Sequence, residues 1–190
     1  SFSAESKSLH TFLLFSGNDF PEPIPVRTVR NQNPHGFSTP NLLIISPEKF
    51  KEQALRLADF RRTNDGLTVQ VATTEEVFNE FASGQPDVSA IRDFTKYLYD
   101  RQPQTLRYLL LFGDAKYDAK NRLLSVTSSQ LNDYVPVYES RESLTPLYSY
   151  SSDDYFGFLE NTEGIWSEDY AGDHSLDIGI GRLPIKNITE

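Results

Sequence analysis

The sequence predicts an α/β fold in which a mostly parallel sheet lies between layers of helices. Tyr108 to Phe112 form a run of five apolar residues, which suits a strand better than a helix. Their lack of alternation indicates that both faces of this strand are covered, as at the centre of a parallel sheet. Strand-like and helix-like segments alternate along residues 41–112, and this order is typical of parallel sheets with right-handed crossovers.

Residues 1–40 are predicted to be a linker, or an edge strand that belongs to a preceding domain. Residues 11–15 have the apolar character of a strand. Three prolines between residues 21 and 25 then exclude a helix, because proline lacks the N–H that a helix interior needs. The α/β domain is therefore predicted to cover residues 41–190.

The first strand of the domain is predicted over residues 41–45. Ser46 and Pro47 then predict the start of a helix, with the serine as N-cap and the proline at the first helical position. This helix is predicted to run to about Thr63. It would bury one stripe of apolar side chains, which consists of Phe50, Ala54, Leu57 and Ala58.

Alternating apolar and polar residues over 67–71 predict a half-exposed strand. Two helices are expected next, one opening at Thr73 and ending at the Gly-Pro break of residues 83–86. The other helix is capped by Asp87, and the apolar residues on one side of it are Ile91, Phe94 and Leu98. The strand at 108–112 completes the order β-α-β-α-α-β.

The pattern changes after Gly113 and Asp114, where residues 115–134 show no clear period. Val135 to Tyr138 contains a proline, so it is predicted to be an edge strand or an extended loop. Residues 148–155 are predicted to be a loop. A hairpin is predicted from residues 155–159 and 164–166, and a final strand from residues 177–181.

Composition and charge exclude several classes of function. The net charge is −9 and no basic cluster is present, which argues against nucleic-acid binding because phosphate contacts need concentrated Lys and Arg. No apolar run approaches the length of a membrane span. The 190 residues contain no cysteine, so they hold no disulfide, no thiolate zinc site and no cysteine nucleophile.

The residues also predict no complete catalytic site. The three histidines are His10, His35 and His174, and no Gly-x-Ser-x-Gly elbow precedes a predicted helix. The glycines are scattered, and none forms a phosphate-binding loop between a strand and a helix. The predicted set of catalytic residues within this chain is therefore empty.

Two carboxylates are candidates for substrate binding. Asp114 follows the central strand, and ligands bind at the carboxyl ends of strands in open α/β sheets; a simple turn residue is the alternative. Asp153 would be costly to bury alone, so it is a candidate for binding a Lys or Arg side chain of a substrate.

Acidic residues also gather late in the sequence, and a calcium site is one interpretation of them because calcium takes hard oxygen ligands. A solvated acidic rim and a paired-carboxylate hydrolase are the alternatives. The sequence does not identify the metal ligands, and no other cofactor is indicated. The acidic residues concerned are Asp153, Asp154, Glu168, Asp169, Asp173 and Asp177.

Six segments are characteristic in their order and spacing: Asn31–Gly36, Ser83–Asp93, Tyr108–Asp114, Val135–Ser140, Ser152–Gly157 and Asp177–Pro184. Together they resemble the gingipain family of cysteine peptidases, and within it the sortase, or C-terminal signal peptidase, of the type IX secretion system. The resemblance covers residues 30 to 190.

The resemblance implies a caspase-like fold of two sub-domains, of which residues 41–190 are the N-terminal one. In that family the catalytic His and Cys follow the segment that matches Gly181–Pro184. The partner of this chain would therefore be the C-terminal catalytic sub-domain of the same protein, and this chain alone would be inactive. His35-Gly36 lies too early in the sequence to be the catalytic His-Gly motif.

The resemblance also implies a polypeptide substrate, a structural calcium ion and a location outside the cell or on the outer membrane of a Gram-negative bacterium. In the arginine-specific members an Asp in a Ser-Asp-x-x-Tyr-Gly motif lines the specificity pocket, and Asp153 occupies that position. The expected function is processing of the C-terminal signals of secreted proteins. The alternatives are a non-catalytic secreted binding module and a calcium-stabilised structural module.

Overall fold

A computed structural model describes residues 24–25, 28–116, 134–140, 147, 149–163, 173 and 175–190. The chain divides into two compact units, residues 1–31 and residues 32–190. In the first unit the described residues form no helix or strand. The predicted linker or edge strand of residues 1–40 therefore stays a prediction, since most of it lies outside the described residues.

The second unit contains the predicted parallel sheet. Its four strands are β1 (Leu42–Ser46), β2 (Val69–Thr73), β3 (Tyr108–Phe112) and β6 (Gly179–Leu183), in the order β2-β1-β3-β6. All three strand pairs are parallel. The predicted α/β fold class is therefore confirmed, and strand β3 lies inside the sheet. The prediction that both faces of this strand are covered is wrong in part, because within the described residues Tyr108 is 46% exposed and Leu110 on the same face is half-buried.

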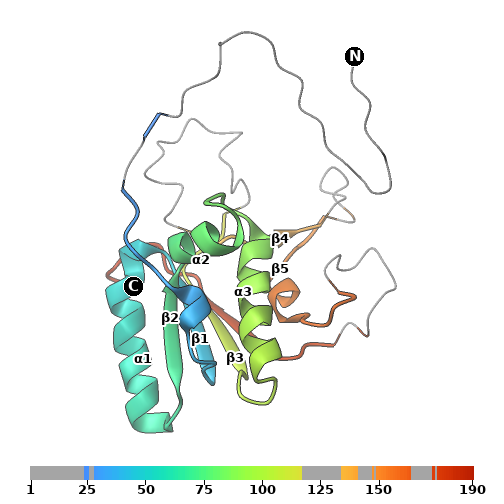
Figure 1. The fold of residues 1–190 in the computed structure, drawn as a ribbon, viewed down its shortest axis with the longest axis horizontal. Helices are drawn as coiled ribbons and strands as arrows, with labels where there is room; N and C mark the ends of the chain where they lie inside the picture. Colours follow the sequence, from blue (N-terminus) through green and yellow to red (C-terminus); the bar gives the residue numbers. More distant parts are fainter. Residues whose placement is uncertain are drawn as a thin grey trace, which may run out of the picture. The chain divides into compact units, whose positions relative to one another are not determined.

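Helices cover both faces of this sheet, and each face has its own apolar core (Figure 1). Helix α1 (Lys51–Asp65) packs Ala54 and Ala58 against one face of β1 and β2, together with Phe50 just before the helix. Helices α2 (Thr74–Phe81) and α3 (Val88–Arg101) cover the opposite face, where Leu43 and Leu109 are fully buried. The alternation of side chains along each strand thus supplies two cores from one sheet.

The ends of α1 and α2 show how local chemistry sets the boundaries. Gly66 ends α1 with φ +65°, a left-handed conformation that favours glycine, and its N–H donates to the Arg61 carbonyl. Thr73 and Glu76 form a capping box at the start of α2, each side chain accepting from the other residue's N–H.

Some predicted boundaries are wrong. Ser46 does not cap a helix, because it is the last residue of β1 and its hydroxyl donates to the Pro47 carbonyl at 2.9 Å. A 3-10 turn, η2 (Glu48–Phe50), precedes α1 instead. The strands predicted at 67–71 and 177–181 each begin two residues later, as β2 and β6.

The predicted hairpin is also wrong in its first half. Residues 154–157 form a 3-10 helix, η4 (Asp154–Gly157), because Ser152 Oγ accepts the Asp154 N–H and the Asp153 carbonyl accepts the Phe156 N–H. The second half of the predicted hairpin, residues 164–166, lies outside the described residues. The short strands β4 (Tyr138–Glu139) and β5 (Ser151–Ser152) form a separate antiparallel pair. A short 3-10 helix, η1 (Pro34–Gly36), precedes β1.

In the described part of the chain, no helix combines the length and the apolar character required to cross a membrane.

Candidate functional site

The carboxyl end of the sheet brings both predicted substrate-binding residues to one edge. Asp114 follows β3, its N–H donates to the Ile185 carbonyl at 3.0 Å, and its carboxylate lies 3.5 Å from Lys186 Nζ. Asp153 directly precedes η4, whose aromatic side chains Tyr155 and Phe156 are buried in the core under α3. The burial of these two rings fixes the turn that presents Asp153.

Arg182 joins these two parts of the edge. Its guanidinium forms a two-pronged ion pair with Asp153, with Nε to Oδ2 at 2.8 Å and Nη2 to Oδ1 at 2.7 Å. It also donates to the carbonyl oxygen of Gly113, the neighbour of Asp114, at 3.0 Å. Arg182 was not among the residues predicted from the sequence, although an arginine near the end of a short strand beside glycines was a sign of a specific charge partner.

The ion pair is mostly withdrawn from solvent. The Arg182 side chain is 11% exposed and the Asp153 side chain is 24% exposed. Both carboxylate oxygens of Asp153 thus already accept strong bonds from within the chain. A direct contact between Asp153 and a basic substrate side chain would have to displace Arg182 first.

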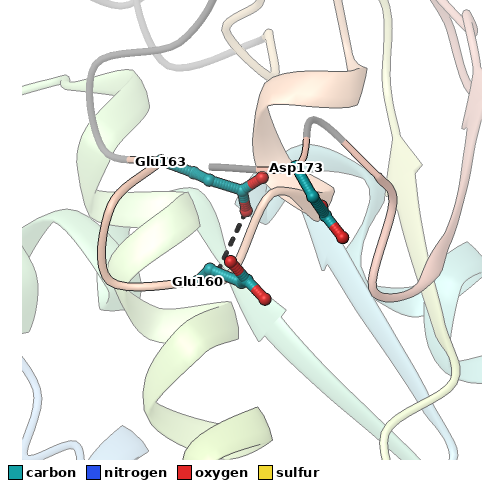
Figure 2. A group of neighbouring side chains, drawn as sticks. All are labelled: Glu160, Glu163 and Asp173. Atoms are coloured by element: carbon teal, nitrogen blue, oxygen red, sulfur yellow. Dashed lines mark hydrogen bonds between the residues drawn. The ribbon is translucent and has the colours of Figure 1, made fainter. Parts of the chain in front are cut away.

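The acidic residues of the later loops come together only in part. Glu160, Glu163 and Asp173 form an acidic cluster (Figure 2). Each offers one carboxylate oxygen, and these three oxygens lie within 4.8 Å of one another. Asp173 was among the residues singled out in the sequence, whereas Glu160 and Glu163 were missed. Glu163 is only 1% exposed, and its carboxylate accepts the Glu160 N–H at 3.1 Å.

The other acidic residues have different roles or lie elsewhere. Asp177 accepts the Leu159 N–H at 2.7 Å and the Tyr99 hydroxyl at 3.2 Å. Burial raises the pKa of Tyr99, and the negative charge of Asp177 adds to this rise. Glu168 and Asp169 lie outside the described residues.

Helix α3 positions the loop that carries the acidic cluster. Arg92 is 5% exposed and donates to the carbonyls of Phe158 at 2.7 Å and Glu160 at 3.0 Å. Lys96 Nζ donates to the Leu159 carbonyl at 2.6 Å. These contacts hold the backbone beside Glu160, so the cluster is attached to a rigid helix.

Three carboxylates are a suitable beginning for a calcium site. Calcium takes six to eight oxygen ligands, so backbone carbonyls and water would complete the coordination. The donor set contains no nitrogen or sulfur, which favours a hard cation over zinc or copper.

His35 has a packing role. Its ring stacks on Phe81 with centroids 4.6 Å apart, and Nδ1 lies 2.9 Å from a Glu80 carboxylate oxygen. It therefore joins the segment before β1 to α2. His10 and His174 lie outside the described residues, so the structure does not test the prediction that this chain holds no catalytic residue.

Comparisons with known proteins place the chain in a family. The model of peptidase family C25 matches residues 35–190. A search among curated proteins finds no match. Among solved structures, dimeric latent PorU from Porphyromonas gingivalis is 35% identical with a TM-score of 0.71, over 85% of this chain and 15% of that chain.

Two gingipain structures are also similar, at lower levels. The complex of the pro- and mature domains of RgpB from Porphyromonas gingivalis is 21% identical over 77% of this chain and 25% of that chain, with a TM-score of 0.47. The Arg-specific cysteine proteinase gingipain R is 19% identical over 80% of this chain and 26% of that chain, with a TM-score of 0.46. The match to the family model and the PorU similarity confirm the predicted resemblance, and the chain belongs to peptidase family C25, the gingipain family.

Proposed function

We propose that this chain is the N-terminal part of a cysteine endopeptidase domain that processes the C-terminal signals of secreted proteins at the cell surface. The observation that carries the proposal is the 35% identity to PorU over 85% of this chain, together with the family match. This chain spans 15% of that PorU chain. The C-terminal catalytic sub-domain of the same protein is the proposed partner, and it would supply the His and Cys.

In the proposed mechanism a thiolate from the partner sub-domain attacks the peptide carbonyl, and the histidine moves the proton. This chain has no cysteine, so it contributes the sheet and a wall of the substrate site. Asp114 and Asp153 belong to that wall because both lie at the carboxyl end of the sheet. Asp114 faces the exposed Lys186, whereas Asp153 acts through its ion pair with Arg182.

A peptide-library assay tests the proposed activity. We expect the full-length protein to cleave peptides and a thiol-alkylating reagent to abolish the cleavage, while residues 1–190 alone cleave nothing. Cleavage by residues 1–190, or cleavage that resists alkylation, would contradict the proposal. A full-length protein that binds polypeptides without cutting them would favour a binding module instead.

Substitutions of the two carboxylates test the substrate wall. Asp114→Asn in the full-length enzyme is expected to raise KM, by about tenfold if it removes ~1.4 kcal/mol of binding. Asp153→Asn is expected to raise KM indirectly, because it breaks the ion pair that holds Arg182 at this edge. Asp59→Asn is the matched control, because Asp59 is exposed on α1 and, within the described residues, its ion pair is with the neighbouring Arg62. Unchanged KM in both test variants would remove these residues from the substrate site.

A calcium-binding role for the acidic cluster is a second proposal, favoured by the buried position of Glu163 beside Glu160 and Asp173. Calcium at millimolar concentration is expected to raise Tm, and EDTA to lower it. Glu163→Gln should reduce this response while Asp59→Asn preserves it. An equal response in both variants would place the calcium effect elsewhere in the protein.

A further inference from the structure

The segment that precedes β1 is held against α2 and α3 by side chains. Residues 32–37, here called the strap, include η1 and begin where the unit of residues 1–31 ends. Within the described residues, no backbone–backbone hydrogen bond joins the strap to the helices, and the two that the strap makes close its own turn. The strap is therefore attached to the helices in the way that a bound peptide is, through side-chain contacts.

The amide group of Gln32 binds three groups of α2. Its Nε2 donates to the Glu76 carbonyl at 2.8 Å and to the Glu80 carboxylate at 3.1 Å. Its Oε1 accepts a hydrogen bond from the Asn79 side chain at 3.2 Å. A carboxylate or an alkyl side chain could not both donate and accept at this position, so the position is specific for an amide.

The ring of His35 occupies the next position on the same helix. It stacks on Phe81 with centroids 4.6 Å apart, and it meets Tyr97 edge-on with centroids 5.1 Å apart. Its Nδ1 lies 2.9 Å from the carboxylate oxygen of Glu80 that Gln32 does not use. Glu80 thus binds both side chains of the strap, and the second position favours a planar ring with an N–H group.

Helix α3 binds the main chain of the strap. The Tyr97 hydroxyl donates to the His35 carbonyl at 2.8 Å. Arg101 Nη1 donates to the carbonyls of His35 at 3.3 Å and Phe37 at 2.8 Å. Helix α2 therefore recognises side chains and α3 recognises carbonyl groups. Peptide-binding surfaces use the same division, in which main-chain bonds give affinity and side-chain positions give specificity.

The strap can leave this surface without unfolding of the sheet. Pro34 is its one buried residue, and the His35 side chain is 46% exposed. Segments with few buried side chains and partly exposed polar contacts open at a small fraction of the global free energy of unfolding. A peptide in solution can then compete with the strap for the same groups on α2 and α3.

We propose that the surface between α2 and α3 is a peptide-binding site and that the strap is its internal occupant. The ligand is a peptide with a glutamine and, three residues later, a histidine in a tight turn, because these two side chains share Glu80. The strap lowers the affinity for such a peptide, since the apparent affinity scales with the fraction of molecules in which the site is open. This site does not depend on the proposed peptidase function.

A fluorescent synthetic peptide with the sequence of residues 30–39 tests the site. The full-length protein is first treated with a thiol-alkylating reagent, so that cleavage does not remove the probe. We expect Gln32→Ala/His35→Ala, in which the strap is loosened, to bind the peptide at least about tenfold more tightly than the wild type does. A peptide with alanine at the same two positions should bind this variant at least about tenfold more weakly.

Glu80→Ala, added to the variant with the loosened strap, should abolish peptide binding because it removes the carboxylate that both side chains share. Glu52→Ala is the matched control, since Glu52 is an exposed glutamate of α1, and it should leave binding unchanged. The proposal is overturned if the loosened variant does not bind the peptide or binds it no more tightly than the wild type. Equal binding by the two glutamate variants would also overturn it.

Hydrogen exchange in the wild type gives a second measurement that needs no folded variant. Gly36 and Phe37 donate their N–H groups within the strap, to the carbonyls of Asn33 and Pro34. Excess peptide should displace the strap and speed exchange at both amides, whereas the alanine-substituted peptide should not. Unchanged exchange would overturn the proposal. Exchange that varies with protein concentration would show that the strap of a second copy fills the site, and the strap would then not be an internal occupant.

Discussion

Gly157, the last residue of η4, lies against Leu176 and against Ile180 of strand β6. A Cβ atom at this position would come within 2.8 Å of Leu176 Cδ2 and 3.0 Å of Ile180 Cγ1. Leu176 Cδ2 is the end of a side chain and can yield, whereas Ile180 Cγ1 is bonded directly to the β-carbon and yields less. Overpacking of this kind typically costs about 1–3 kcal/mol. The absence of a side chain at residue 157 therefore allows η4 to approach the sheet and to hold Asp153 in place.

We predict that Gly157→Ala destabilises the fold by about 1 kcal/mol, because the new methyl group has to displace Leu176 and Ile180. Urea denaturation measures this change. Gly181→Ala is the control, since its nearest neighbour would be Leu110 Cδ1 at an ordinary 3.9 Å. Equal losses in the two variants would show that close packing at residue 157 is not the cause.

Tyr155 gives the fold a dependence on alkaline pH. Its side chain is 5% exposed, and burial raises the pKa of its phenol above the ordinary value of 10.0. The folded protein therefore keeps this proton at a pH where the unfolded chain releases it. Stability from this group is fully present below pH 10 and is lost as pH rises from 10.0 through the raised pKa.

Tyr155→Phe is predicted to reduce this alkaline loss of stability, since phenylalanine has no proton to lose. The measurement is the free energy of unfolding between pH 9 and pH 11. Tyr108→Phe serves as the control because Tyr108 is 46% exposed. If the alkaline loss is identical in wild type and Tyr155→Phe, another group causes it.

At the scale of single elements, helix α2 begins at a capping box that also ends β2. Thr73 Oγ1 accepts the Glu76 N–H at 3.2 Å, and the Glu76 carboxylate accepts the Thr73 N–H at 2.8 Å. Thr73→Ala is predicted to cost about 1 kcal/mol of stability, as is usual for the loss of such a cap. Thr73→Ser should retain most of it, because serine keeps the accepting hydroxyl. Chemical denaturation that finds both variants equally unstable would argue against the cap.

The elements that the sequence predicted well are those with a strong and regular pattern. The strand predicted at Tyr108–Phe112 and the apolar stripe from Phe50 to Ala58 are both present, because each fits the alternating order of strands and helices around it. The structure of residues 155–159 was harder to predict, because their apolar side chains pack beneath α3 from a 3-10 helix and do not alternate as in a strand. A short apolar run does not distinguish these two outcomes.

The candidate site was predictable only in its position. Asp114 lies at the carboxyl end of the sheet, as expected for a residue that follows a parallel strand, whereas the sequence did not predict that Asp153 lies at the same edge. Their partners were not predictable, because Arg182 is 29 residues from Asp153 in sequence and meets it only through the pairing of β6 with β3. The proximity of Glu160 and Asp173 was equally unpredictable, because they are brought together by loops whose sequences have no periodic pattern.

At the scale of the whole molecule, the two faces of the described sheet are covered unequally. Helix α1 covers β1 and β2, whereas a groove lies beside it over β3 and β6. Tyr108 and Leu110 face this groove together with Gly179 and Gly181, which offer no side chain to shield the backbone. Parallel sheets are normally covered on both faces, so this region is where the proposed partner sub-domain would add its own layer.

Strand β6 forms one edge of the described sheet. Gly179 donates its N–H to Arg107 beside β3, so the alternating N–H groups of Ile180 and Arg182 point away from β3. We expect a further strand of the full-length protein to pair with this edge, because an open edge invites pairing with another strand. Hydrogen exchange in the full-length protein should then be slow at Ile180 and Arg182. Val71 is the control, because its strand β2 forms the other edge of the described sheet. The Val71 N–H lies on the outer side of this strand, the side on which the Val69 carbonyl binds Arg62. Exchange at Ile180 and Arg182 as fast as at Val71 would mean that the partner sub-domain does not extend the sheet at β6.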